Sequence, residues 1–136
     1  MVMSDPELGL SVKRLQMKHH RAATEALRPL DVSLVQWDAL RHLHANPGAS
    51  LHDLAVLTFQ TDQAFGTLAT RLEARGLIRR VTGTGRAIRP ELTPEGERVF
   101  TEGQQLTERV VRRSFAPLDD AERAALSSML ERLLAQ

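Results

Sequence analysis

Short hydrogen-bonding side chains recur on one face of a segment near the middle of the chain, between positions 61 and 75. A helix that shows only such side chains to water can enter a groove and present donors and acceptors there. The major groove of B-DNA is about 12 Å wide and admits one helix, in which Arg71 suits a guanine and Gln63 an adenine. The chemistry that this face predicts is therefore base recognition in DNA. The candidate DNA-contacting residues are Thr61, Gln63, Gly66, Thr67, Thr70 and Arg71.

The other face of this segment is apolar. Four residues recur at i, i+3, i+4 and i+7, which is the spacing of a helix that buries one stripe against a core. They are Phe65, Leu68, Ala69 and Leu72. Gly76 follows, and glycine tolerates the left-handed conformation that ends a helix. The sequence therefore predicts a helix with a buried back and a polar front.

A short hairpin is predicted directly after this helix. The composition of 77–81 predicts a strand, 82–85 a turn and 86–92 a returning strand. Pro90 cannot donate a ladder hydrogen bond. The returning strand is therefore either an edge strand or broken at that residue.

Positive charge is concentrated in the helix and the hairpin. From Arg71 to Arg89 there are six Arg and one acidic residue, although the whole chain has a formal net charge of only +1. A local concentration of Arg attracts a polyanion, but a solvated surface shows the same pattern. Arg75, Arg79 and Arg80 are expected to meet phosphates or structural carboxylates rather than bases.

The composition excludes several classes of protein. A chain of 136 residues is long enough for one domain with a real core. The absence of Cys excludes a disulfide scaffold and a Cys-based zinc site, and it is compatible with a cytosolic protein. No apolar run approaches the roughly 18 residues of a membrane span. The first residues are acidic and include Pro6, so no signal peptide is expected.

Helices are expected throughout the part of the chain that precedes the hairpin. Pro29 ends the first one, because the residue before a proline is pushed out of the helical region. Capping boxes at Ser33 and Ser50 open the next two, since the third residue after each can reach back to the cap. The expected helices cover 8–30, 33–45, 51–57 and 61–75, with a break at Thr58, Phe59 and Gln60.

The helices 51–57 and 61–75 are separated by a few residues, and the second is polar on its outer face. That order is the plan of a helix-turn-helix, and a hairpin directly after it makes the plan winged. Trp37, on the preceding helix, is better suited to the core than to a ligand contact. The expected inner face of that helix comprises Val35, Trp37, Leu40 and Leu43.

Two further helices are predicted after the hairpin. Thr93 caps one that has Pro94 at its first position and runs to Phe115, and Asp119 caps the last. The last helix has a wide apolar face, which a small chain buries either within the monomer or against a partner. We expect a two-fold dimer formed together with the first helix. The apolar positions are Ala125, Leu126, Met129, Leu130, Leu133 and Leu134.

The ordered set of motifs between Ser33 and Gly96 resembles the MarR family of bacterial transcription regulators. The spacing and order agree over roughly half of the chain. The matching pieces are Gln36-Trp37-Asp38-Ala39-Leu40, Asn46-Pro47-Gly48, Leu54-Ala55, Leu72-Glu73-Ala74-Arg75-Gly76-Leu77-Ile78, Arg86-Ala87 and Leu92-Thr93-Pro94-Glu95-Gly96. Two places depart from the family pattern. Thr84 and Gly85 replace an Asp-Arg pair of the wing, and Phe59-Gln60 replaces a Gly-aliphatic turn.

The resemblance implies a mainly α fold with a small β-hairpin wing and about six helices, in an intertwined homodimer built from the N- and C-terminal helices. It also implies that Arg86 reaches the adjacent minor groove or its phosphates. The implied division is a single domain 1–136, with dimerisation helices 8–30 and 94–135 and a DNA-binding lobe 33–92 that contains the recognition helix 61–75 and the wing 77–92. Many members are repressors that release DNA when a small aromatic acid binds.

The expected function is therefore a ligand-responsive repressor that binds a palindromic operator in double-stranded DNA as a homodimer. It would be cytoplasmic and associated with the nucleoid when bound. No cofactor or membrane partner is expected. A small aromatic effector is expected between the first, second and fifth helices, with Met17 and Trp37 nearby. Repression and activation both remain open.

Three other classes of protein compete with this interpretation. An enzyme is disfavoured, because the chain has no zinc-protease, nucleophile-elbow or phosphate-loop motif and no Cys nucleophile. A metal-sensing regulator would need His ligands from separate helices to converge. A winged-helix protein-interaction module would share the fold without binding DNA. The salt dependence of binding distinguishes this last class from a DNA-binding protein, because affinity for DNA falls steeply as the salt concentration rises.

Overall fold

The computed structural model describes residues 1–82 and 88–136. It contains six α-helices, one 3-10 turn and a two-stranded antiparallel hairpin, which confirms the predicted mainly α class with a wing. The helices are α1 (Asp5–Ala26), α2 (Leu34–Ala45), α3 (Leu51–Leu57), α4 (Asp62–Ala74), α5 (Pro94–Phe115) and α6 (Asp120–Leu134). The 3-10 turn η1 covers Arg28–Leu30, and the strands are β1 (Ile78–Thr82) and β2 (Ile88–Leu92).

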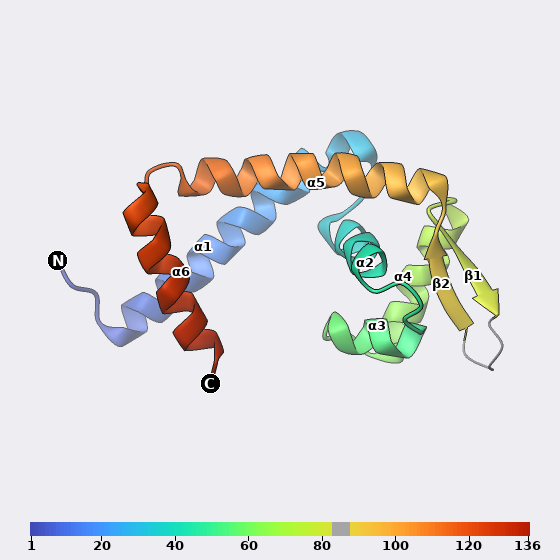
Figure 1. Ribbon diagram of the computed structural model, residues 1–136, viewed down its shortest axis with the longest axis horizontal. Coiled ribbons are helices and arrows are strands. Elements are labelled where there is room, and N and C mark those ends of the chain that lie inside the picture. Colours follow the sequence, from blue (N-terminus) through green and yellow to red (C-terminus); the bar gives the residue numbers. More distant parts are fainter. Residues whose placement is uncertain (83–87) are drawn as a thin grey trace.

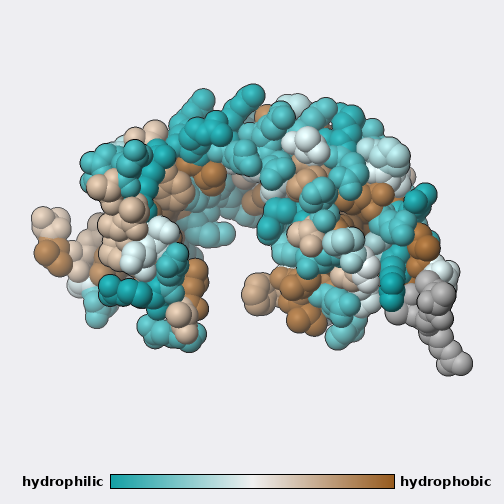
Figure 2. Space-filling view, in the orientation of Figure 1, coloured by the Kyte–Doolittle hydropathy of each residue, from teal (hydrophilic) through white to brown (hydrophobic). Residues whose placement is uncertain are grey.

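The elements are arranged around the long helix α5, which spans the molecule with α1 packed beside it (Figure 1). At one end of α5, helices α2, α3 and α4 gather with the hairpin. At the other end lie the N-terminal part of α1 and the last helix, α6, with a hollow between the two ends (Figures 1 and 2). Within the described ranges, no helix combines the length and apolar character that a membrane crossing requires.

The hydrophobic core lies under α4, in the lobe formed by α2, α3, α4 and the hairpin. The predicted apolar stripe of α4 is confirmed, because all four residues are buried, with exposed fractions of 9% or less. They pack with fully buried residues of the neighbouring elements, such as Leu40 of α2 and Leu54 of α3. Burying the back of α4 in this way fixes which face is left for solvent.

Helix α2 packs tightly against α5 through an aromatic side chain and a glycine. The indole Nε1 of Trp37 donates to the carbonyl oxygen of Phe100 at 3.2 Å, and the two rings stack. A Cβ at Gly103 would lie 2.3 Å from the indole nitrogen, so only glycine allows this approach. The prediction that Trp37 is a core residue is confirmed. The prediction for Val35 is wrong, because it lies in the first turn of α2, at the edge of the core, and is 52% exposed.

The wing is a regular antiparallel pair in which Arg80 lies opposite Pro90. A two-stranded hairpin has only edge strands, so Pro90 leaves β2 unbroken. Gly76 has φ +72°, which confirms it as the residue that ends α4. The positions assigned to the wing tip, Thr84, Gly85 and Arg86, lie outside the described residues.

The first helix differs from its expected range of 8–30. It begins at Asp5, because Ser4 accepts from the amide of Glu7 while the Glu7 carboxylate accepts from the Ser4 amide at 2.8 Å. This capping box, with a proline in the first turn, is a sequence signal that was missed. The helix ends at Ala26, and η1 and Asp31 (φ +54°) carry the chain to α2.

The last helix buries none of its residues against the described part of the chain. Leu133 is 64% and Leu134 82% exposed. Packing of this face inside the monomer, the alternative weighed from the sequence, is therefore not what the fold shows. Other exposed apolar side chains lie on α1 and α5 and include Leu8, Leu10, Val12, Leu15, Met17 and Val111.

Candidate nucleic-acid interface

The outward face of α4 consists of the side chains predicted to contact DNA. Thr61 caps the helix by accepting from the amide of Ala64 at 3.0 Å. The side chains are presented on a helix whose back is buried, while α6 lies at the far end of the molecule (Figure 1). Gln63, Thr67, Thr70 and Arg71 are exposed, and Gly66 is half-buried among them.

Two hydroxyl groups on this face are already committed to the helix backbone. The Thr67 hydroxyl donates to the carbonyl oxygen of Gln63 at 3.1 Å. The Thr70 hydroxyl donates in the same way to Gly66, at 3.0 Å. Each hydroxyl has a single proton, so only acceptor capacity is left for a further hydrogen-bond partner.

Arg80 of the wing lies against α4 and not at the surface of the hairpin. Its Nη2 donates to the carbonyl oxygen of Gly66 at 3.2 Å and to the Thr70 hydroxyl oxygen at 2.9 Å. Of the two expectations for Arg80, the structural carboxylate is not met, because no carboxylate of the described residues pairs with it. Its contacts are with backbone and hydroxyl oxygens on the recognition helix.

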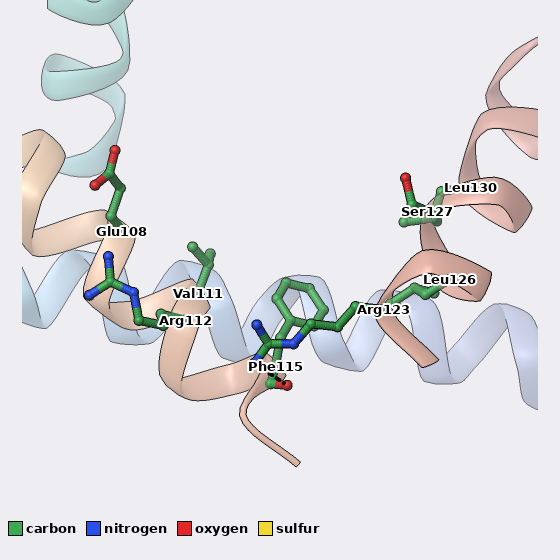
Figure 3. A pocket seen from close by; sticks show the side chains of 8 residues that line it. All are labelled: Glu108, Val111, Arg112, Phe115, Arg123, Leu126, Ser127 and Leu130. Atoms are coloured by element: carbon green, nitrogen blue, oxygen red, sulfur yellow. Dashed lines mark hydrogen bonds between the residues drawn. The ribbon is translucent and has the colours of Figure 1, made fainter. Parts of the chain in front are cut away.

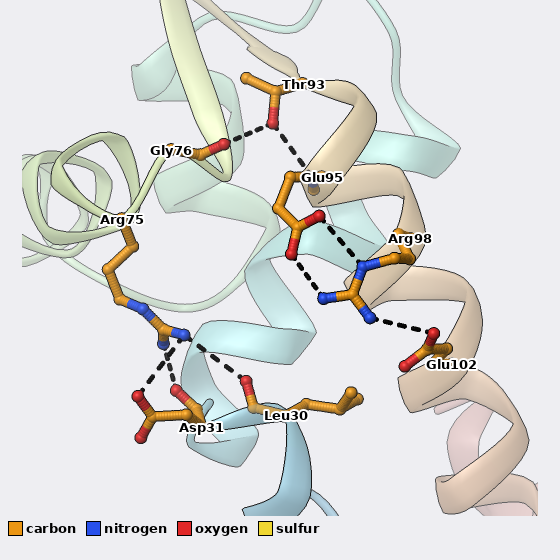
Figure 4. A network of polar contacts seen from close by, with 9 residues as sticks. Leu30, Asp31, Arg75, Gly76, Thr93, Glu95, Arg98 and Glu102 are labelled. Carbon is orange, nitrogen blue, oxygen red and sulfur yellow. Dashed lines mark hydrogen bonds and ion pairs between the residues drawn. The ribbon is translucent and has the colours of Figure 1, made fainter.

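Arg75 and Arg79 meet structural carboxylates, one of the two expectations for them. Arg79 Nη2 lies 3.2 Å from Glu91, its neighbour across the hairpin. Arg75, at the end of α4, lies 3.7 Å from the Asp31 carboxylate and also donates to the carbonyl oxygen of Asp31 (Figure 4). Arg75 therefore links the C-terminal end of α4 to the turn before α2, and Arg79 links the two strands of the wing.

The junction between α4 and α5 is tied by a threonine that serves both elements. The Thr93 hydroxyl donates to the carbonyl oxygen of Gly76 at 2.6 Å and accepts from the amide of Gly96 at 3.0 Å (Figure 4). A Cβ at Gly96 would lie 2.0 Å from the Leu77 carbonyl oxygen, so glycine permits the close approach of α5 to the hairpin. The recognition helix is thus fixed to α5.

A contact missed from the sequence joins the start of α3 to the start of α4. Nδ1 of His52 lies 2.8 Å from Oδ1 of Asp62, the first residue of α4. The hydrogen bond to Asp62, and then the charge of Asp62, raise the pKa of His52. The neighbouring Asp53 has a lowered pKa, chiefly because its carboxylate accepts from the Ser50 amide. His52 and Asp62 each lie in the first turn of a helix. The sequence offers no other signal that the two side chains approach each other.

The turn between α3 and α4 is closed by backbone hydrogen bonds, with Gln60 donating to Ala55 at 2.8 Å. Phe59 takes the left-handed conformation there, with φ +56°, and its side chain is 98% exposed. Phe59 is therefore not a core residue. The turn keeps the geometry that a glycine would give it, and the aromatic ring faces solvent.

Grooves outside the lobe that carries α4 include two that lie between helices. One, of about 480 Å³, runs between α5 and α6 and is lined by Val111, Phe115, Leu126 and Leu130 among others (Figure 3). The other, of about 580 Å³, runs between α1 and α5. Within 1–82 and 88–136, no group of three or more His, Asp or Glu side chains converges as a metal site would require.

Most of the charged side chains that line the second groove are basic. The basic residues are Lys18, Arg109 and Arg113. Among the described residues that line the groove, Glu25 is the one acidic residue. His19 crosses from α1 and lies 2.6 Å from the Ser114 hydroxyl of α5. The arrangement suits a small anion. Trp37, expected near an effector, is instead buried against Phe100.

Comparison with known proteins shows what this chain is similar to. Residues 30–87 match the model of the MarR family. The HTH-type transcriptional repressor Rv2887 of Mycobacterium tuberculosis is 28% identical over 131 residues, which cover 95% of this chain and 94% of the repressor. Wild-type MarR from E. coli, in its apo form, shares the fold with a TM-score of 0.83 at 21% identity, over 98% of this chain and 99% of that one.

The mycobacterial protein also has solved structures. Its complex with DNA has a TM-score of 0.78 at 26% identity and covers 93% of this chain and 96% of that one. Its complex with salicylic acid has a TM-score of 0.75 at 28% identity and covers 93% and 95%. Taken with the winged helix-turn-helix geometry described above, these matches show that the chain is similar to the MarR family of transcription regulators.

Proposed function

We propose that this protein is a transcriptional repressor that binds a palindromic operator in double-stranded DNA as a homodimer and releases it when a small aromatic acid binds. The observation that carries the proposal is the outward face of α4, which is polar, largely exposed and backed by a buried apolar stripe. A relative with a repressor's name and a structure in complex with DNA supports it. Such a function would place the protein in the bacterial cytoplasm, on the nucleoid when bound. We propose no catalytic role.

The proposed roles of the site residues follow from their positions. Gln63, Thr67, Thr70 and Arg71 would contact base edges, because they are exposed on the face that enters the groove. Gly66 would let the helix approach closely, since a Cβ there would meet open space among the described residues. Thr61, at the N-terminal cap, lies where helix amides favour a phosphate. Arg86 would reach the minor groove or its phosphates, as the family resemblance implies.

The proposed homodimer rests on apolar surface that the monomer leaves exposed. Apolar side chains of α1, α5 and α6 remain in contact with water, and α5 and α6 enclose the first groove between them (Figures 2 and 3). A helix of a second copy is the occupant that suits a groove of this kind. A two-fold axis would then place two α4 helices about 34 Å apart, one turn of DNA, on the same face.

The proposed effector site is the basic groove between α1 and α5. Cationic side chains such as Arg113 would pair with a carboxylate, and the mycobacterial relative was solved with salicylic acid. The test is release of operator DNA by salicylate. Arg113→Met should weaken the response, whereas Arg41→Met, on the exposed surface of α2 and outside both grooves, should leave it unchanged. If salicylate releases DNA equally well from both variants, the effector does not bind in this groove.

Selection of bound sites from random duplex DNA tests the central proposal. Enrichment of a palindrome with half-sites one helical turn apart is the expected result. Affinity for the selected site should fall steeply between 50 and 200 mM salt, as phosphate contacts require. If no site is enriched and duplex binding is absent or insensitive to salt, the repressor proposal fails. The winged helix would then be a protein-interaction module.

A further inference from the structure

Arg80 reaches from the wing to the recognition helix and contacts a hydroxyl proposed to meet DNA. Its Nη2 lies 2.9 Å from the oxygen of Thr70 and 3.2 Å from the carbonyl oxygen of Gly66. Thr70 itself donates to that same carbonyl, at 3.0 Å. The three groups form a closed triangle of hydrogen bonds on the groove side of α4.

The triangle determines which hydrogen bond Thr70 can still make. Its one proton is given to Gly66, and one lone pair accepts from Arg80. A hydroxyl oxygen has two lone pairs, so the remaining outward capacity is that of an acceptor. In the major groove, the donors that meet an acceptor are the exocyclic amino groups, N6 of adenine and N4 of cytosine.

The burial of Arg80 argues against a direct role on phosphate. Arg80 is half-buried, and its Nε is buried with no hydrogen-bond partner among the described residues. The covered Nε edge excludes the side-on, two-pronged contact with phosphate through Nε and Nη2. The end-on contact also needs Nη2, which is already hydrogen-bonded to α4. A buried donor without a partner destabilises the folded protein. The hydrogen bonds of Nη2 to α4 offset part of this loss of stability.

We propose that Arg80 is a positioning residue that holds Thr70 as a fixed hydrogen-bond acceptor, so that α4 prefers an adenine or cytosine amino group at one position of each half-site. The inference rests on the proposed function. It adds to that function the chemical identity of the base edge that Thr70 recognises, and it gives the wing a second role as a brace for the recognition helix.

Neighbouring residues provide matched controls. Arg79 is adjacent on the same strand but lies across from Glu91, 3.2 Å away, and is exposed. Thr67 makes the same kind of hydrogen bond to the helix backbone as Thr70, and among the described residues its only side-chain hydrogen bond is that one, to Gln63. Changes at Arg79 or Thr67 should therefore leave the preference contributed by Thr70 intact.

The experiment measures dissociation constants on operator variants that carry each of the four base pairs at each half-site position. The unaltered protein should favour an amino-bearing base at one position by about five- to tenfold, the value of one net hydrogen bond. Thr70→Val and Arg80→Met should each abolish that preference, and the double variant should lose nothing more. Thr70→Ser and Arg79→Met should keep it.

Arg80→Lys separates positioning from charge and is the conservative variant if Arg80→Met does not fold. Lysine retains the positive charge but lacks the planar fork that donates in fixed directions. The preference should fall in Arg80→Lys while the salt dependence stays that of the unaltered protein. If Arg80→Met instead weakens every sequence equally and lowers the salt slope by about one, Arg80 is a phosphate contact. Either that result, or a lower Tm with the preference retained, would overturn the proposal.

An NMR measurement without DNA distinguishes this inference from the proposed function. Thr70 should populate one χ1 rotamer in the unaltered protein and in Arg79→Met, and several in Arg80→Met. A single rotamer in Arg80→Met would refute the positioning role, whatever the protein binds. In another outcome, the rotamer responds as expected although the unaltered protein binds no duplex DNA. That result would refute the proposed function and base recognition by Thr70, but it would retain the positioning of Thr70 by Arg80.

Discussion

His52 Nδ1 lies 2.8 Å from Asp62 Oδ1, so the first turn of α3 is joined to the first turn of the recognition helix. The contact raises the pKa of His52 above its ordinary value of 6.5. A raised folded-state pKa means that the stabilisation is complete below the unfolded pKa and is lost as the pH rises through the folded value. His52→Gln should therefore reduce the free energy of unfolding more at pH 5.5 than at pH 8.5.

Urea unfolding at the two pH values measures this effect. His20→Gln is the control, because His20 is an exposed histidine of α1 that makes no side-chain hydrogen bond or ion pair with any described residue. An equal loss of stability at both pH values in His52→Gln would show that the His52–Asp62 contact contributes nothing through its charge.

Gly103→Ala tests the packing of α2 against α5. The added Cβ would lie 2.3 Å from the Trp37 ring nitrogen, so the two helices would have to separate. We expect a loss of about 1–3 kcal/mol, typical of an overpacked core. Gly9→Ala is the matched control in α1, where the described residues leave the Cβ site open. It should stabilise by about 0.5–1 kcal/mol. Similar changes in Tm for both variants would contradict the packing argument.

Phe59→Gly tests the left-handed turn before the recognition helix. Glycine adopts φ +56° without the steric cost that a side chain adds, and that cost is about 1–2 kcal/mol. Since Phe59 is 98% exposed, little packing is lost with its ring. We expect Phe59→Gly to be more stable than Phe59→Ala by about 1 kcal/mol in chemical unfolding. Equal stabilities would indicate that the turn relaxes in one of the variants.

Leu133→Asp tests whether α6 forms the dimer interface. Leu133 is 64% exposed in the monomer, and an uncompensated charge buried between two copies costs about 3–5 kcal/mol. Sedimentation velocity should show association weakened by about 100-fold or more. Val35→Asp, at a 52% exposed site on α2, should remain dimeric. If both variants remain dimeric, α6 does not form the dimer interface.

Gln63→Ala and Arg86→Ala should affect DNA binding in different ways. Gln63 lies exposed on the groove face, so its loss should change which sequences are preferred, by about 1–3 kcal/mol at one base pair. Arg86, if it meets phosphate or the minor groove, should weaken binding to all sequences. Gel-shift titrations on a randomised operator set compare the two. Identical effects on every sequence would refute this division of roles.

Much of the fold was predictable because its signals are local. The capping boxes at Ser33 and Ser50 and the cap at Thr93 bond to amides within three residues, so the sequence contains the whole interaction. The apolar stripe of α4 and its polar front follow from helical periodicity alone. The same local evidence was available at Ser4 and was missed, which misplaced the start of α1.

The tertiary structure decided what depends on two segments meeting. Arg80 and Thr70 are ten residues apart, and only the return of the wing onto α4 brings their side chains to 2.9 Å. Val35 has the spacing of a core residue but lies beyond the edge of the core. Periodicity identifies the face of a helix, whereas burial and side-chain pairing depend on what other segments place against that face. The sequence alone therefore determined the helices and the polar outward face of α4. Packing determined how the side chains of that face are held.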